Sequence, residues 1–74
     1  MQIIDFHLIT DYIDLLQLLK AAGIAMSGGE AKMFVNEGMI TVNNEPESRK
    51  RRKLRLGDVV VFNDQITITL IKSE

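Results

Sequence analysis

Cysteine and tryptophan are absent from this chain of 74 residues, which has one proline, one histidine and only 5% aromatic residues. Without cysteine there is no disulfide framework and no thiolate to act as a nucleophile or metal ligand, as is usual in a reducing compartment. The sequence also lacks an apolar run near the roughly 20 residues of a membrane span, and its start lacks the basic region and apolar core of a signal peptide. We therefore expect a cytoplasmic protein without a membrane partner.

Length and composition predict one domain over residues 1–74. Hydrophobic residues make up 46% of the chain and charged residues 26%, a proportion too low and too mixed in sign for general disorder. A chain of this size buries only about 60% of its unfolded surface. We expect it to fold alone, with modest stability.

Positive charge is concentrated in one stretch, although the formal net charge is -1. Six of the nine Lys and Arg residues lie between positions 49 and 55, in what we call the basic segment: Arg49, Lys50, Arg51, Arg52, Lys53 and Arg55. Charges closer than the Debye length of about 8 Å create a local positive field that suits a polyanion. A solvated loop or disordered tail is the alternative. However, the segment runs into Leu54, Leu56 and a strand-like stretch at 59–62, which should anchor it.

Helical spacing of apolar residues predicts two helices in the first half of the chain. The first runs from Tyr12 to Ala22, with Thr10 or Asp11 as its N-cap and Gly23 at its end. The second starts at the capping box Ser27-Gly28-Gly29-Glu30, in which the Ser hydroxyl and Glu carboxylate reciprocally satisfy backbone N–H groups. Gly38 then closes it in a left-handed conformation.

Alternation of apolar and polar residues predicts strands elsewhere. Ile4, Phe6 and Leu8 indicate a short edge strand before the helices, and three further strands are expected around 40–42, 59–62 and 66–70. Turns are expected at Asn43-Asn44, Gly57-Asp58 and Asn63-Asp64, with Leu54 and Leu56 on one face. The sequence thus predicts an α+β fold, in which two short N-terminal helices pack on a small, curled, mostly antiparallel sheet.

The order of these elements resembles the S-four-like RNA-binding domain family, also called the alpha-L motif. The resemblance covers about Tyr12 to Val61. It is carried by Leu15, Leu19, Gly23, Ser27, Glu30-Ala31-Lys32, Gly38, Ile40, Val42, Asn43 and Leu56-Gly57-Asp58-Val59. It implies a small free-standing bacterial member without a catalytic domain. It also implies that the exposed face of the second helix and the adjoining sheet turn contact structured RNA, often ribosomal or transfer RNA, with a ribosomal particle as a candidate partner.

The resemblance adds three residues of the second helix to the candidate site. Lys32 keeps the family's basic position, on the opposite side of the helix from Phe34. Gly28 stands where many members have a basic residue, but the Gly28-Gly29 pair would let a phosphate approach the helix start. A purely local backbone reason for these glycines is the alternative.

The chemistry of the basic segment favours recognition of folded RNA by backbone and shape. Arg49, Arg51 and Arg52 offer planar forks for phosphate, whereas Lys50 and Lys53 act as mobile point charges. Aromatic residues are scarce and the three Phe side chains look buried, so we expect no base-stacking platform of the single-strand-binding type.

The sequence contains no convincing catalytic or metal-binding arrangement, so we predict no enzyme activity, cofactor or small-molecule substrate. His7 has no partner nearby in the sequence, Ser27 is explained by capping, and Asp11 and Asp14 suit the first turn of a helix. Two other functions remain open. Two closely joined helices also describe a DNA-binding helix-turn-helix, and a small α/β domain could serve protein interaction.

Overall fold

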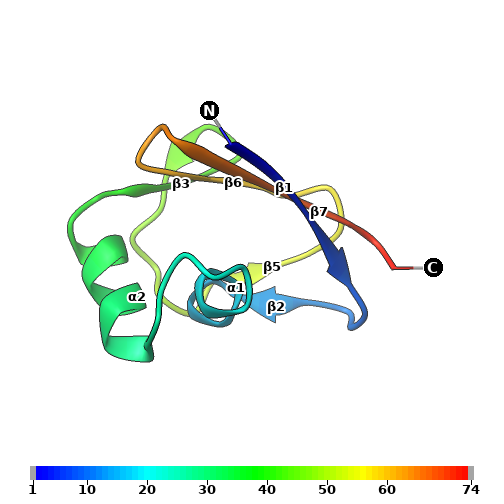
Figure 1. The fold of residues 1–74 in the computed structure, drawn as a ribbon, viewed down its shortest axis with the longest axis horizontal. Helices are drawn as coiled ribbons and strands as arrows, with labels where there is room; N and C mark the ends of the chain where they lie inside the picture. The colour runs from blue at the N-terminus through cyan, green and yellow to red at the C-terminus, as the bar shows by residue number, and fades with distance from the viewer. Residues whose placement is uncertain (1, 74) are drawn as a thin grey trace.

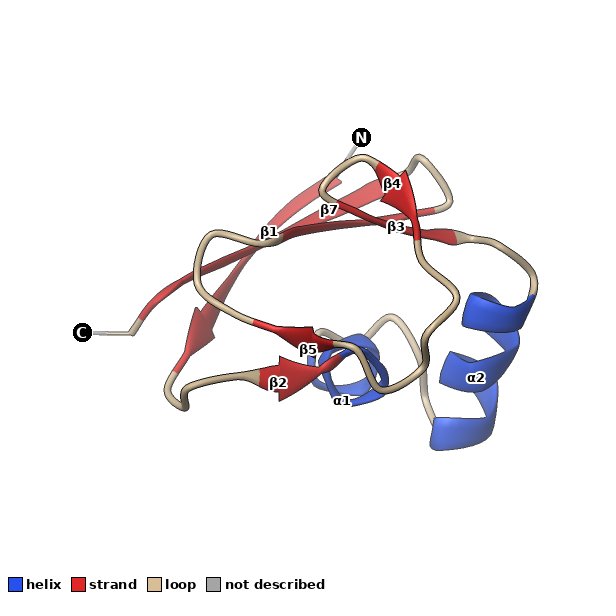
Figure 2. Ribbon diagram, turned by 180° about the vertical axis from the view of Figure 1, so that it is seen from behind, coloured by secondary structure: helices blue, strands red, loops and turns tan. Residues whose placement is uncertain are grey.

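The computed structural model describes residues 2–73, which form two helices, a five-stranded mixed sheet and a two-stranded sheet (Figure 1). The elements are β1 Gln2–Leu8, β2 Ile13–Asp14, α1 Leu15–Ala21, α2 Gly28–Asn36, β3 Ile40–Val42, β4 Glu45–Pro46, β5 Lys53–Leu54, β6 Val59–Phe62 and β7 Ile66–Lys72. The larger sheet has the strand order β1-β7-β6-β3-β4, and the smaller one pairs β2 with β5. Figure 2 shows the small sheet beside α1, apart from the large sheet.

The large sheet is mostly antiparallel, but its first strand runs parallel to its last. β1 pairs with β7 from Gln2 opposite Ile66 to Leu8 opposite Lys72, whereas the other pairs in the described chain are antiparallel. The fold is therefore α+β with a mixed sheet, and both helices follow β1 rather than opening the chain. The edge position predicted for the first strand is confirmed, with Leu8 buried and His7 exposed.

Helix α1 begins later than its apolar spacing predicted. Asp14, rather than Thr10 or Asp11, is the N-cap, and its Oδ1 accepts the Gln17 N–H at 2.9 Å. The preceding residue, Ile13, pairs with Leu54 in the small sheet. That strand pairing holds the chain extended, so the helix starts only at Leu15. The predicted end is correct, because Gly23 has a φ of +78°.

Helix α2 begins and ends where the sequence predicted. Ser27 Oγ accepts the Glu30 N–H at 3.2 Å, but the Glu30 carboxylate accepts the N–H of Met26 at 2.9 Å instead of that of Ser27. The reciprocal half of the capping box is thus shifted by one residue. At the other end Gly38 has a φ of +72°, and the N–H of Met39 reaches back to the carbonyl of Phe34 at 3.1 Å.

Two hairpins of the large sheet turn on pairs of left-handed residues. Asn43 and Asn44 have φ values of +52° and +70° between β3 and β4, and Asn63 and Asp64 have +50° and +55° between β6 and β7. Two central residues with positive φ match the right-handed twist of the flanking strands, which explains the preference for Asn and Asp. Both turns were predicted.

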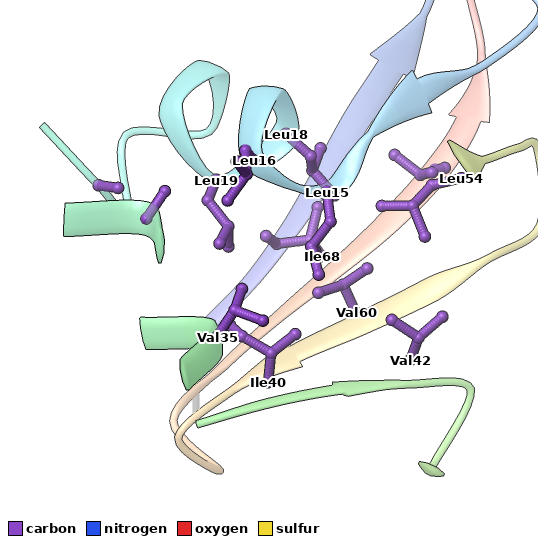
Figure 3. Close-up of a cluster of buried hydrophobic side chains, with 13 residues drawn as sticks. Leu15, Leu16, Leu18, Leu19, Val35, Ile40, Val42, Leu54, Val60 and Ile68 are labelled. Carbon is purple, nitrogen blue, oxygen red and sulfur yellow. The ribbon is translucent and has the colours of Figure 1, made fainter. Parts of the chain in front are cut away.

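The core lies between the helices and the large sheet (Figure 3). Leu15, Leu18 and Leu19 of α1 meet Val35 of α2 and residues of the sheet such as Ile68. The three Phe side chains are only half-buried, and Phe34 packs against Phe62 with ring centroids 4.8 Å apart. Neither α1 nor α2 has the length and apolar content of a membrane span.

Candidate nucleic-acid interface

The backbone of the basic segment is fixed against the start of α1. The carbonyl of Arg52 accepts the N–H of Leu15 at 3.0 Å, and that of Lys50 accepts the N–H of Leu16 at 3.3 Å. The first N–H groups of a helix have no partner within the helix, so these carbonyls satisfy donors that would otherwise need water or a cap. The segment is a folded loop with a defined position, and not a disordered tail.

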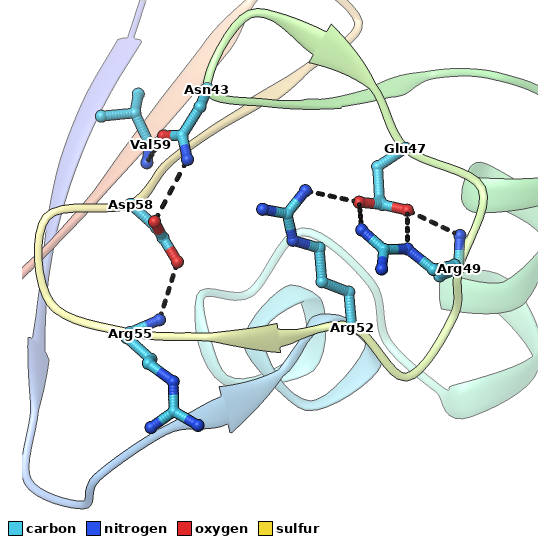
Figure 4. A network of polar contacts seen from close by, with 7 residues as sticks. All are labelled: Asn43, Glu47, Arg49, Arg52, Arg55, Asp58 and Val59. Carbon is cyan, nitrogen blue, oxygen red and sulfur yellow. Dashed lines mark hydrogen bonds and ion pairs between the residues drawn. The ribbon is translucent and has the colours of Figure 1, made fainter.

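A buried carboxylate beneath this loop orients two of its arginines (Figure 4). The Glu47 side chain is only 5% exposed, and its Oε2 accepts bonds from Nε and the backbone N–H of Arg49 at 3.0 and 2.9 Å. Its Oε1 accepts from Arg49 Nη2 at 3.1 Å and Arg52 Nη1 at 2.7 Å. These bonds lower the pKa of Glu47 from 4.5 to about 2, and the hydrogen bond from the Arg49 side chain contributes most. Burial opposes the change, because it raises the pKa of a carboxyl group.

The same network leaves donors on both arginines for a ligand. A guanidinium carries five N–H donors, of which Glu47 uses two from Arg49 and one from Arg52. The Arg49 side chain is 71% exposed, and that of Arg52 is 28% exposed. One carboxylate cannot neutralise two guanidinium groups, so the cluster retains positive charge.

An open hollow on this surface is lined by basic residues: Arg49, Arg51, Arg52 and Lys53. Arg51 and Lys53 are exposed, whereas Lys50 is half-buried and supplies its backbone carbonyl to α1. A concave surface of one charge focuses the electrostatic field and attracts counterions. The hollow therefore suits an anionic ligand such as phosphate.

The outer face of the small sheet continues the positive surface and adds an aromatic ring. Leu54 is fully buried, so its neighbours Lys53 and Arg55 project to the opposite side. The Lys53 Nζ lies 4.9 Å and the Arg55 Cζ 5.7 Å from the ring centroid of Tyr12. Leu56 was expected to share the inward face with Leu54, but it is 52% exposed because β5 ends at Leu54.

Helix α2 carries the remaining candidates. Lys32 is exposed, and the buried residues of α2 are Ala31 and Val35. A Cβ added at Gly28 would meet no atom within 4 Å, so packing does not require glycine there. The nearby Glu30 brings negative charge to the same helix start, which opposes phosphate binding by Gly28 and Gly29.

A family model described as the S4 domain matches residues 6–70, which is most of the chain. The chain belongs to the S4 domain family. This is the S-four family whose motifs the sequence resembles, and membership supports a role in RNA binding.

This S4 domain protein is similar to several bacterial proteins. It is 51% identical over 51 residues to "Probable ribosome maturation protein RlbA" of Bacillus subtilis, an alignment that covers 69% of this chain and 72% of that protein. It is 39% identical over 51 residues to "Putative RNA-binding protein YbcJ" of Escherichia coli, covering 69% and 73%. A tyrosine–tRNA ligase of Rhizobium meliloti is 43% identical over 47 residues, covering 64% of this chain but only 11% of the ligase.

Several residues that identify this S4 domain hold two of its turns together (Figure 4). Asn43 Oδ1 accepts the N–H of Val59 at 2.9 Å, and its Nδ2 donates to Asp58 Oδ1 at 3.1 Å. The other oxygen of Asp58 accepts the N–H of Arg55 at 2.8 Å. The Asn turn and the Gly-Asp turn thus fix the end of the basic segment, which gives these motif residues a structural purpose.

The other polar candidates show no catalytic arrangement within residues 2–73. His7 is exposed on β1, Asp14 caps α1, and no group of three or more His, Asp or Glu residues could hold a metal there. Sequence reasoning missed the contacts of Glu47 with Arg49 and Arg52, and it missed the position of Tyr12 beside Lys53 and Arg55. Asp14, directly before an uninterrupted pair of leucines, was the signal that could have placed Tyr12 outside the helix.

Proposed function

We propose that this S4 domain protein is a non-catalytic module that binds structured RNA through the basic segment and through Lys32 of α2. The observation that carries the proposal is the hollow lined by Arg49, Arg51, Arg52 and Lys53, on a loop whose backbone is bonded to α1. A preformed set of cations on a rigid loop suits the regularly spaced phosphates of a folded RNA.

Ribosomal or transfer RNA is the proposed ligand class. One relative is named for ribosome maturation and another is a tRNA ligase, so we propose a ribosomal particle or its RNA as the partner in the cytoplasm. The proposed site also includes Gly28 and Gly29, which share the start of α2 with the carboxylate of Glu30. Unchanged RNA affinity on replacing either glycine by alanine would remove that glycine from the proposed site.

A salt titration of RNA binding tests the proposal. If about four phosphates are neutralised, log affinity should fall against log salt with a slope of roughly -3 to -4, and each charge removed should make it shallower by almost one. We expect this shallowing for Arg51→Gln and for Lys32→Gln. Lys72→Gln is the matched control, because it removes the same charge from the end of β7.

Suitable probes are a ribosomal RNA hairpin, a transfer RNA and a DNA duplex of similar charge. Equal affinity of the parent and Arg51→Gln for all three would contradict the proposed site. Binding of the duplex alone would favour a helix-turn-helix function instead. Crosslinking in cells, followed by sequencing of the bound nucleic acid, would then identify the natural ligand.

A further inference from the structure

Tyr12 is an exposed aromatic residue on the outer face of the small sheet. Ile13 pairs with Leu54, so the residues on either side of this pair, Tyr12 and Arg55, project together to the opposite face. Tyr12 is 44% exposed. The sequence did not predict this position of Tyr12, because the apolar spacing placed Tyr12 in the first helix.

The ring is held in place before any ligand binds. Lys53 and Arg55 lie within 6 Å of the ring centroid, at 4.9 and 5.7 Å, where a cation is attracted to the π electrons. The Thr10 hydroxyl donates to the carbonyl of Tyr12 at 2.8 Å, which fixes the backbone of the loop before β2. A ring held in this way loses little freedom when it stacks on a planar ligand.

A second hollow lies beside the ring, and its charge differs from that of the basic hollow. Its lining includes Tyr12, Asp11 and Asp14, without a basic residue. The two carboxylates repel phosphate but can accept hydrogen bonds from the N–H groups of a nucleobase. Lys53 connects the two regions, because it lines the basic hollow and also lies over the Tyr12 ring.

We propose that Tyr12 stacks on one unpaired base of the bound RNA, while Lys53 and Arg55 contact the phosphates that flank it. The inference rests on the proposed function and adds a specificity: the preferred RNA has an unpaired nucleotide beside a helical region. This modifies the expectation, based on scarce aromatic residues, that the protein has no base-stacking platform of the single-strand-binding type. Proteins recognise single-stranded loops and bulges of RNA by stacking their bases on aromatic side chains.

The test compares two RNA hairpins that carry the fluorescent base 2-aminopurine, either unpaired in the loop or paired in the stem. The parent protein should quench the unpaired base on binding and leave the paired one nearly unchanged. Tyr12→Leu should lose the quenching and bind the loop-labelled hairpin about tenfold more weakly. Its affinity for a fully paired RNA and its salt slope should equal those of the parent, because no charge is removed. Tyr12→Phe keeps the ring and should behave as the parent.

The outcomes separate this inference from the proposed function. Failure of the parent to bind any RNA would overturn both. RNA binding by the parent without quenching of the unpaired base would overturn only the stacking. This outcome is measured on the parent protein alone. An equal loss of affinity for looped and paired RNA in Tyr12→Leu would also overturn it, since Tyr12 would then act only by supporting Lys53 and Arg55.

Discussion

Glu47 and Arg52 form an ion pair of 2.7 Å between Oε1 and Nη1, with the carboxylate 5% and the guanidinium side chain 28% exposed. The pair joins the residue after β4 to the residue before β5, and Arg49 forms a second ion pair with the same carboxylate. The basic segment is therefore both a candidate binding surface and a structural link. Its arginines should differ in what they contribute.

Replacing Glu47 by Gln should destabilise the fold by about 1.5–3 kcal/mol, the usual range for hydrogen bonds to a charged group. The amide cannot accept all the bonds that the carboxylate accepts from Arg49 and Arg52. Urea unfolding measures the change. Glu45→Gln is the control, since Glu45 is exposed on β4. Equal unfolding midpoints for the two variants would show that the Glu47 network contributes little.

The contribution of Glu47 should also depend on pH. Its pKa is lowered from 4.5 to about 2 in the folded protein, so folding favours the ionised carboxylate. The resulting stability is complete above the unfolded pKa and is lost as the pH falls from about 4.5 towards 2. The difference in unfolding free energy between parent and Glu47→Gln should therefore shrink over this interval. A difference that stays constant down to pH 2 would contradict the lowered pKa.

Arg51 and Arg52 should separate binding from stability. Arg52→Gln removes a bond to the buried Glu47 and should cost about 1–3 kcal/mol. Arg51 is exposed and lines the basic hollow, so Arg51→Gln should change stability by less than about 0.5 kcal/mol. Thermal melts of the two variants measure this directly. A large loss for Arg51→Gln would mean that its side chain supports the loop.

Ser27→Ala should cost about 1 kcal/mol, the usual value for a lost N-cap. The Ser27 hydroxyl oxygen accepts the N–H of Glu30, which has no other partner at the first turn of α2. Denaturant unfolding is the measurement, and Ser48→Ala, at an exposed loop position, is the control. Unchanged midpoints for Ser27→Ala would reopen a direct role for Ser27 in binding.

Gly38→Val should destabilise the protein by about 1–2 kcal/mol or more, because a β-branched residue is strained at a φ of +72°. Gly38→Asn should cost less, since Asn tolerates the left-handed conformation. No atom lies within 4 Å of a Cβ added at Gly38, so the Cβ itself meets no crowding. Similar stability for the two variants would show that the strain at this position is small.

The sequence predicted those features that depend on residues a few positions apart. The ends of both helices at Gly23 and Gly38, the cap at Ser27 and the Asn turns are all correct, because capping and positive φ are local preferences. The family also followed from the sequence, since its motifs are local and occur in a fixed order. The basic segment was selected by its charge alone, whereas Lys32, Gly28 and Gly29 were added from the family resemblance.

Tertiary structure decided the start of α1, the parallel pairing of β1 with β7 and the arrangement of the site. Ile13 is extended because it pairs with Leu54, and that pairing brings Tyr12 under Lys53 and Arg55. Such contacts join residues about 40 positions apart, and local patterns carry no information about them. The sequence by itself thus determined the helix ends, the hairpin turns and the presence of a basic loop. The tertiary structure decided which cations bind Glu47 and which face solvent. Burial of Leu54 and Glu47 fixes the direction of the neighbouring side chains.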